Sequence, residues 1–330
     1  MPAPSNNGSC HKRAVLVTGS SGFIGTHLHR TLQAADDISS AYGLDIANPK
    51  PGCETGFLKA DIRNVDDLKR VAKVVQPHAI FHLAAVAEVV IPFHEFPQLF
   101  GTNLGGTINV LDILKPKILL SASSSAVCGD APSSGARATW KAVSPVGIYG
   151  MSKAAAEMVG RDWARETRNI SLHFRFGNVV GPNCRGLIPY LVRHALQYPD
   201  GSAPARLRAG GRVQRDYVPV QHLIEVMISA MRAEWRPGTD EAFNIGTGRI
   251  TTNGDVARIV QRVLRERGYK LDLRFDDPLL PGESKHVVLD VSKTTKKLGV
   301  PVPSRKAVVQ AIEEGVSSQL ELMARSATAQ

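Results

Sequence analysis

AVLVTGSSGFIG, at residues 14–25, is the stretch that decides how the chain begins to fold. Residues 14–17 form an apolar run that predicts a buried strand, and Gly19, Gly22 and Gly25 predict a turn into a helix. Glycine suits such a turn because a side chain would hold the backbone away from a pyrophosphate, which binds the free N–H groups at the start of the helix. The stretch therefore predicts a dinucleotide site.

An acidic residue, Asp45, follows this turn. It ends a second short run at 41–45 and lies about 20 residues beyond Gly25, the spacing of a ribose-binding acid. A carboxylate there accepts hydrogen bonds from the adenosine ribose and repels a 2′-phosphate, so we expect NAD rather than NADP. The alternative is a tight structural turn followed by a surface aspartate, because glycine-rich turns also serve purely conformational needs.

The length and charge of the chain narrow its function class. Its 330 residues suit one large domain or two closely joined ones, and its formal net charge is +10. The Lys and Arg residues are scattered, with no block of five or more, so we expect no nucleic-acid partner. A positive balance also suits an anionic substrate such as a nucleotide sugar, and we favour that interpretation.

The cysteines and the apolar runs indicate the cellular setting. Cys10, Cys53, Cys128 and Cys184 are far apart and lack a metal-like spacing, so we expect neither disulfides nor a bound metal. No apolar run approaches the roughly 20 residues that cross a bilayer. The first 13 residues form a polar tail without a signal-peptide apolar region. The sequence therefore predicts a cytoplasmic protein that does not bind membranes.

Beyond the first strand and helix, apolar strands alternate with helical segments. Further strands are expected at 57–61, 79–85, 117–123, 171–176 and 243–248, and helices at 66–75, 96–114, from 149 onward, 189–196, 220–231 and 255–267. The alternation predicts an α/β fold with a doubly wound parallel sheet, in which ligands bind at the carboxyl ends of the strands. We expect a Rossmann domain over 12–178, with later returns near 215–248, and a smaller C-terminal lobe made mainly from 179–330.

Three polar residues have an order that predicts catalysis. Tyr149 and Lys153 are four residues apart on an expected helix, so they share one face. The lysine ammonium favours the phenolate, as does the positive nicotinamide of NAD, which predicts a lowered pKa for Tyr149 and an acid/base role. Ser124 follows a strand and would hold a reacting sugar hydroxyl. Taken singly, each residue is better explained as a cap, a chance pair or a solvated charge; together, downstream of a nucleotide turn, they favour catalysis.

Eight motifs run along the chain from residue 15 to about residue 300. They are TGSSGFIG at 18–25, HLAA at 82–85, NLGGT at 103–107, SSSAVCG at 123–129, YGMSK at 149–153, GNVVGP at 177–182, RDYVPV at 215–220 and NIGTG at 244–248. In them the chain resembles the extended short-chain dehydrogenase/reductase family, in particular its NAD-dependent nucleotide-sugar epimerases and dehydratases. The motifs are highly specific for the family and much less specific for the reaction.

The resemblance implies a cofactor role for residues from five segments. The pyrophosphate would contact Gly19, Gly22, Phe23, Ile24 and Gly25; the ribose would contact Asp45; the adenine would contact Asp61 and Ile62; and the rest of NAD would contact Leu83, Ala84, Ala85, Tyr149 and Lys153.

The resemblance also implies a substrate site and a dimer. Ser124, Tyr149 and Lys153 match the catalytic trio, of which Ser124 and Tyr149 would touch the substrate. Asn178 and Arg215 match residues that hold a nucleoside diphosphate, for which a guanidinium is a bidentate donor. The family implies a C-terminal substrate-binding lobe and a homodimer formed through two helices, here about 100–114 and 149–166.

The residues after Ser124 help to choose the reaction. Family dehydratases and decarboxylases place an acid just after the catalytic Ser or Thr, whereas this sequence has Ser125 and Ala126. The resemblance therefore implies a 4-epimerase for a UDP-hexose or UDP-uronic acid, in which C4 is oxidised, the 4-keto sugar turns over and hydride returns to the other face. A dehydratase or ketoreductase, and a non-catalytic NAD-sensing regulator, are the alternatives.

Three positions depart from the family pattern. Cys128 stands where a tyrosine is usual, and we interpret it as a packing residue, with a pocket-shaping change as the alternative. Leu280 occupies the place of an arginine, which predicts one phosphate contact fewer. Gly177 replaces a bulky aromatic residue before Asn178.

Overall fold

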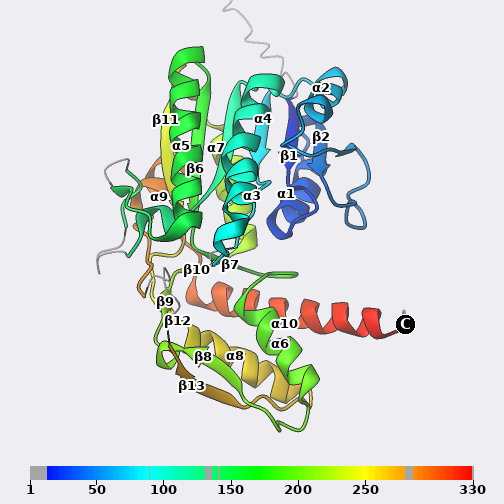
Figure 1. Ribbon diagram of the computed structural model, residues 1–330, viewed down its shortest axis with the longest axis vertical. Helices are drawn as coiled ribbons and strands as arrows, with labels where there is room; N and C mark the ends of the chain where they lie inside the picture. The colour runs from blue at the N-terminus through cyan, green and yellow to red at the C-terminus, as the bar shows by residue number, and fades with distance from the viewer. Residues whose placement is uncertain (1–12, 89, 131–135, 140–141, 279–284, 329–330) are drawn as a thin grey trace, which may run out of the picture.

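The computed structural model describes residues 13–88, 90–130, 136–139, 142–278 and 285–328, and its central element is a seven-stranded parallel sheet (Figure 1). The strand order is β11-β6-β5-β4-β1-β2-β3. These strands are β1 (Arg13–Thr18), β2 (Ile38–Asp45), β3 (Phe57–Lys59), β4 (Ala79–His82), β5 (Ile118–Ser124), β6 (Ile170–Phe176) and β11 (Asp240–Ile245). Because the order reverses between β1 and β4, the sheet has a topological switch point there, where open α/β sheets bind ligands.

The sheet is buried on both faces, as the apolar residues of its central strand β1 show. Val15 and Val17 pack in one core cluster with α1 (Phe23–Gln33) and α7 (Val220–Arg232). Leu16, between them, packs in the opposite cluster with α2 (Val65–Val74) and α4 (Gly106–Leu114). The alternation follows from the two-residue repeat of a strand. With α5 (Gly147–Thr167) in front beside α4, helices cover both faces of the sheet (Figure 1).

The expected helix at 96–114 is present but contains an irregular turn. It consists of α3 (Phe96–Phe100), a π-helical turn at Gly101–Gly105 and α4, with no change of direction between them in Figure 1. Short 3-10 helices occur at Phe93–Glu95, Ser125–Cys128 and Ala209–Gly211. Such π turns occur often at functional sites.

A second group of elements packs below the carboxyl ends of the sheet strands. It includes α6 (Leu187–Gln197), α8 (Asn253–Glu266), α10 (Arg305–Thr328) and the strand pair β8 (Ala205–Arg208) with β13 (Leu273–Asp277). These elements share a separate core cluster. Two small pairs complete the fold: β7 (Asn178–Val180) with β10 (Tyr217–Pro219), and β9 (Gln214–Arg215) with β12 (Thr251–Thr252). The last helices are α9 (Ser292–Leu298) and α10, which the sequence did not lead us to expect.

The predicted fold class is confirmed: the molecule is a Rossmann-like α/β protein with small additional sheets. The expected helices and strands agree with the structure to within a few residues, the π turn aside. No helix among the described residues is both long and apolar enough to span a membrane. The cytoplasmic location remains a prediction, and the N-terminal tail with Cys10 lies outside the described residues, as does Leu280.

Candidate active site

The glycine turn, residues 19–25, packs so tightly that it has no room for a side chain at Gly19 or Gly25. Gly19 has a φ of +74°, and a Cβ on it would lie 2.7 Å from the backbone nitrogen of Ala84 after β4. A Cβ on Gly25 would lie 2.0 Å from the carbonyl oxygen of Gly19. Gly22 is the N-cap of α1 and makes no side-chain capping bond, so the first N–H groups of α1 face the turn. Such a helix start binds phosphate.

A cavity of about 490 Å³ extends from this turn along the carboxyl ends of β2, β4 and β5 to α5. It is lined by every residue to which we assigned a cofactor role: Gly19, Gly22, Phe23, Ile24, Gly25, Asp45, Asp61, Ile62, Leu83, Ala84, Ala85, Tyr149 and Lys153. The structure thus brings these separate sequence segments to one cavity at the switch point of the sheet. Its volume lies in the range of small-molecule sites.

Two aspartates line the part of the cavity next to β2 and β3. The carboxylate of Asp45 accepts hydrogen bonds from the backbone N–H of Ser21, at 2.9 Å, and of Ala47, at 2.9 Å, so it is oriented by the glycine turn itself. Asp61 pairs with Arg63 at 2.6 Å, and this hydrogen bond lowers the pKa of Asp61. Two fixed hydrogen-bond acceptors therefore lie beside the turn, as the ribose and the adenine of a dinucleotide require.

Tyr149 and Lys153 lie on the buried face of α5, beside the end of β5. Lys153 Nζ donates a hydrogen bond to the carbonyl oxygen of Ala122, at 2.9 Å. Ser124 ends β5, and its hydroxyl accepts from the backbone N–H of Ala126 at 3.2 Å. The expected trio is therefore assembled at one strand end, with Tyr149 and Lys153 in the cavity wall.

The expected lowering of the Tyr149 pKa is not found. Burial raises the pKa of Tyr149, and a hydrogen bond with Ser124 lowers it by less. Burial also lowers the pKa of Lys153 to about 8, although Glu157 opposes that shift. The sequence argument considered the attraction of the Lys153 ammonium and of the nicotinamide for the phenolate, and omitted the desolvation that Tyr149 and Lys153 both undergo. The positive nicotinamide of NAD, when bound, favours the phenolate.

Asn178 lies on β7 and Arg215 on β9, and neither is among the residues that line the cofactor cavity. The backbone N–H of Asn178 donates to the carbonyl oxygen of Asp216 at 2.7 Å, which brings β7 against the segment that carries Arg215. Both side chains are partly exposed. The short distance between this part of the chain and Asp216 also explains Gly177, because a Cβ there would lie 2.5 Å from the Asp216 carbonyl oxygen. The two predicted diphosphate-binding residues are thus close in the fold, outside the residues that line the cavity.

Cys128 is a packing residue in this structure. It is buried in a small cluster with Ala136 and Leu289, and burial raises the pKa of its thiol. Its sulfur accepts a contact from Arg175 Nη1 at 3.8 Å. The structure therefore supports the packing interpretation of this departure from the family pattern.

Sequence reasoning missed several polar residues of the site. Arg185 lines the cavity and is exposed, and Glu157 and Arg175 form a buried ion pair behind Tyr149 and Lys153. Two signals were available for the pair. Glu157 lies four residues after Lys153, and Arg175 is a charged residue within a strand that is otherwise uncharged. Within the described residues, no group of three or more His, Cys, Asp or Glu could hold a metal ion.

Residues 15–246 match the NAD dependent epimerase/dehydratase family. The chain belongs to this family. Among curated relatives, it is 27% identical over 328 residues to the UDP-glucose 4-epimerase of Pisum sativum, covering 86% of this chain and 90% of that one. It is 25% identical over 342 residues to the CDP-paratose 2-epimerase of Salmonella typhi, covering 92% and 99%. Among solved structures, the UDP-glucose 4-epimerase of Thermus thermophilus in complex with NAD has a TM-score of 0.80 at 25% identity, covering 93% and 99%.

The site residues fit the cofactor that the family uses. The glycine turn leaves a cradle that a Cβ would fill, the start of α1 is uncapped by side chains, and the Asp45 carboxylate is fixed beside both. This donor set suits a pyrophosphate and a ribose without a 2′-phosphate. The prediction of NAD is confirmed by membership of the family.

Proposed function

We propose that this protein is a nucleotide-sugar 4-epimerase that acts on a UDP-hexose or a UDP-uronic acid. The observation that carries the proposal is the assembly of Ser124, Tyr149 and Lys153 at one end of the cavity that the glycine turn begins. The named 4-epimerase and 2-epimerase relatives support an epimerase, but at about a quarter identity they do not fix the sugar.

The distribution of carboxylates favours epimerisation over elimination. Among the described residues that line the cavity, the carboxylates are Asp45 and Asp61, which come from the end of β2 and the segment after β3. In the sheet, β2 lies three positions from β5, roughly 14 Å at the usual strand spacing. The reacting end therefore offers a phenol, a hydroxyl and an ammonium, which suffice for reversible oxidation at one carbon.

Each residue of the trio has a separate task in this proposal. Tyr149 Oη takes the proton of the sugar 4-hydroxyl and later returns it to the 4-keto oxygen. Ser124 Oγ holds the same oxygen in line with the phenol, and the Lys153 ammonium stabilises the phenolate. NAD, when bound, supplies the hydride acceptor and donor.

The substrate's diphosphate would stay anchored while the sugar turns. We assign the anchor to Asn178 and to Arg215, the residue before the Asp216 carbonyl to which the Asn178 N–H donates, with the guanidinium as a bidentate donor. Arg185, in the cavity wall, adds a further cation, which suits either a phosphate or a uronate carboxylate. We assign 12–178, with returns near 215–248, to cofactor binding and 179–330 mainly to substrate binding.

The test is to incubate the purified protein with a panel of UDP-, GDP-, CDP- and dTDP-sugars and to follow the products by NMR. Interconversion at C4 without added cofactor is the expected result, together with NAD released on denaturation. Loss of water or of carbon dioxide would reassign the protein to elimination or decarboxylation. If no sugar of the panel is converted while NAD stays bound, the result would favour a non-catalytic NAD-sensing regulator.

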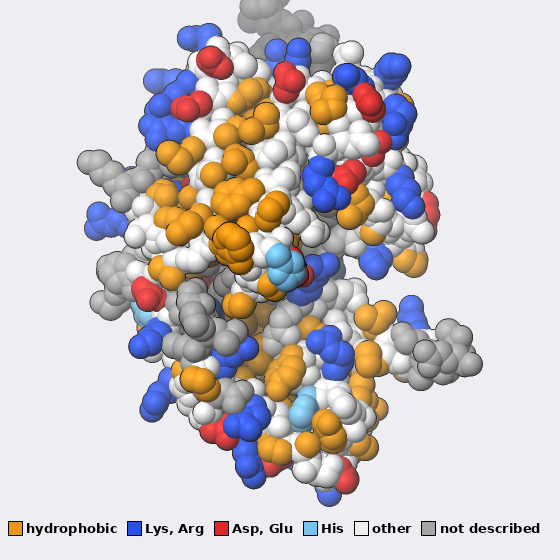
Figure 2. Space-filling view, viewed as in Figure 1, with side chains coloured by type: hydrophobic (Ala, Val, Ile, Leu, Met, Phe, Trp, Pro, Cys, Tyr) orange, Lys and Arg blue, Asp and Glu red, His pale blue; other side chains and the backbone are white. Residues whose placement is uncertain are grey.

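We also propose a homodimer formed through α4 and α5. Figure 2 shows hydrophobic side chains gathered in a column over these helices. The exposed large hydrophobic residues of α4 and α5 are Ile108 (45% exposed), Met151 (48%) and Met158 (59%). Such an exposed apolar patch marks an association site. Ile108→Lys and Met158→Lys should give monomers in analytical ultracentrifugation. Val74→Lys is the matched control, because Val74 is 59% exposed on α2, away from this column. A monomeric native protein would exclude the dimer.

A further inference from the structure

A buried carboxylate, Glu157, lies one helical turn beyond Lys153 in α5 and is 1% exposed. Its Oε1 accepts hydrogen bonds from Ser123 Oγ, at 2.5 Å, and from Arg175 Nε, at 2.9 Å. Its Oε2 accepts from Arg175 Nη2 at 2.7 Å. Glu157 thus joins α5 to β5 through Ser123 and to β6 through Arg175.

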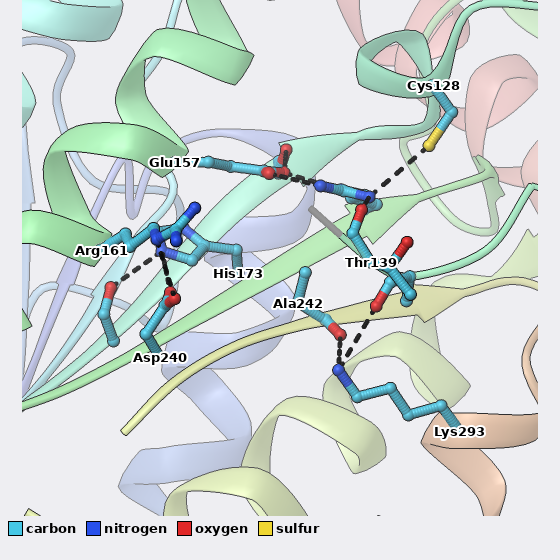
Figure 3. Close-up of polar contacts among 12 residues, drawn as sticks. Cys128, Thr139, Glu157, Arg161, His173, Asp240, Ala242 and Lys293 are labelled. Atoms are coloured by element: carbon cyan, nitrogen blue, oxygen red, sulfur yellow. Dashed lines mark hydrogen bonds and ion pairs between the residues drawn. The ribbon is translucent and has the colours of Figure 1, made fainter. Parts of the chain in front are cut away.

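The Arg175 guanidinium is fixed from its other side. Its Nη1 donates to the carbonyl oxygen of Thr139, at 3.1 Å, and contacts Cys128 Sγ. Figure 3 shows Glu157 on one side of this guanidinium, with Cys128 and Thr139 on the other. Arg175 itself is fully buried. The charge of Glu157 is therefore held in one place by a rigid partner.

Stability alone does not account for this pair. A buried ion pair loses so much hydration that well-packed apolar residues often replace it without loss of stability. Its location next to the proposed reacting groups suggests another purpose. Ser123 lies between Ala122, whose carbonyl oxygen accepts from Lys153, and Ser124, which bonds to Tyr149. Glu157 therefore accepts a hydrogen bond from Ser123, the residue of β5 between the two that bond to Lys153 and Tyr149.

We propose that Glu157, held by Arg175 and bonded to Ser123, is a positioning residue that fixes the end of β5 against α5 so that Ser124, Tyr149 and Lys153 keep their mutual geometry. The inference rests on the proposed function, because it assigns a task to a residue behind that trio. A shift of about 1 Å in such a site lowers the rate by up to about 100-fold.

The same carboxylate also supports the charge of Lys153. The titratable groups that face Lys153 are Glu157 and Tyr149 on α5 and His82 on β4. Those that face Glu157 are Arg175 and His173 on β6 and Cys128 after β5. Of these, Glu157 raises the pKa of Lys153 against the effect of burial. Removing its charge should therefore make Lys153 lose its proton at a lower pH.

The test compares Glu157→Gln with Ser123→Ala. Glu157→Gln keeps the shape but removes the charge, so kcat should fall about 10-fold to 100-fold with little change in KM. The alkaline limb of its pH profile should move down by about one pH unit. Ser123→Ala keeps both charges, so it should lower kcat about 10-fold while the alkaline limb stays in place. Glu166→Gln, an exposed glutamate of the same helix, is the matched control and should change neither quantity.

A readout without substrate separates this inference from the proposed function. In protein carrying isotope-labelled lysine, an NMR titration gives the Lys153 pKa directly, with the signal assigned by its loss in Lys153→Met. That pKa should be lower in Glu157→Gln even if no sugar is converted. If Glu157→Gln lowers the melting temperature but leaves kcat and the alkaline limb unchanged, Glu157 has only a structural role and the inference is overturned. If Glu157→Gln fails to fold, an unchanged kcat in Ser123→Ala would overturn it.

Discussion

The two ends of the cavity are built from different groups. At the glycine turn the wall is mainly backbone: Gly19 and Gly25 leave no room for a side chain, and the Asp45 carboxylate accepts hydrogen bonds from backbone N–H groups. At the α5 end the wall is a set of buried polar side chains whose partners come from β5 and β6. Cofactor recognition therefore depends on a short local sequence, whereas the reacting end depends on contacts between distant segments.

The difference implies that the two ends can be damaged independently. A side-chain change near Tyr149 should stop turnover while NAD still binds. A substitution that displaces the backbone of the glycine turn should weaken NAD binding and lower the stability of the fold. The variants below separate these outcomes, from the largest expected effect to the smallest.

Tyr149→Phe should lower kcat by about 1,000-fold, because the proton of the sugar hydroxyl loses its acceptor. Since the ring remains, the affinity for NAD should change by less than about 10-fold. Steady-state kinetics and calorimetric titration with NAD measure the two quantities. Retained activity would remove Tyr149 from its assigned role.

Gly25→Ala should damage the other end. The new Cβ would lie 2.0 Å from the Gly19 carbonyl oxygen, so the turn must shift. We expect a loss of about 1–3 kcal/mol in the free energy of unfolding and weaker NAD binding. Chemical denaturation and calorimetry measure both. Gly101→Ala is the control, because no atom lies within 4 Å of a Cβ built there; equal losses in both variants would contradict the steric argument.

Asp45→Asn should weaken NAD binding by about 10-fold, because the amide replaces a charged acceptor of ribose hydrogen bonds. It should also narrow the preference for NAD over NADP, since the repulsion of a 2′-phosphate is lost. Binding constants for both cofactors test this, with the exposed Asp36→Asn as control. An unchanged ratio of the two constants would argue against Asp45 as the ribose ligand.

The pH profile should show the smallest effect. Burial lowers the pKa of Lys153 to about 8, and the protonated form is the one that stabilises the phenolate. Loss of the Lys153 proton should therefore give the profile an alkaline limb near pH 8, above which activity declines about 10-fold for each further unit. Lys153→Met should lack this limb. A limb that stays in place in Lys153→Met would belong to another group.

The sequence was sufficient to predict which residues line the glycine-turn end of the cavity, because that end follows local rules. A β-branched strand, a glycine turn and an acid at a fixed distance occur in order, and all thirteen residues assigned to the cofactor line one cavity. The sequence was insufficient to predict the pKa values at the α5 end of the cavity. The lowered pKa expected for Tyr149 was wrong because burial depends on tertiary packing, which residue spacing does not reveal.

The residues that sequence reasoning missed are explained in the same way. Glu157 and Arg175 are 18 residues apart, and only the packing of α5 on β6 brings their charges together. The apolar spacing predicted one regular helix over 96–114 and gave no sign of the π turn at Gly101–Gly105. Arg185 follows β7 in an irregular segment, where periodicity gives no information.

The long helix α10 (red in Figure 1) crosses between the main sheet and the β8–β13 pair. Its Ser318 hydroxyl accepts from the Asn183 N–H at 2.8 Å, and its Gln319 amide donates to the Cys184 carbonyl oxygen at 3.3 Å. These partners are 135 residues apart in the chain, and they fix the loop between Asn178 and Arg185. Contacts of such sequence separation close slowly. During refolding from denaturant, NAD affinity should therefore return before sugar turnover, and stopped-flow mixing would resolve the two phases.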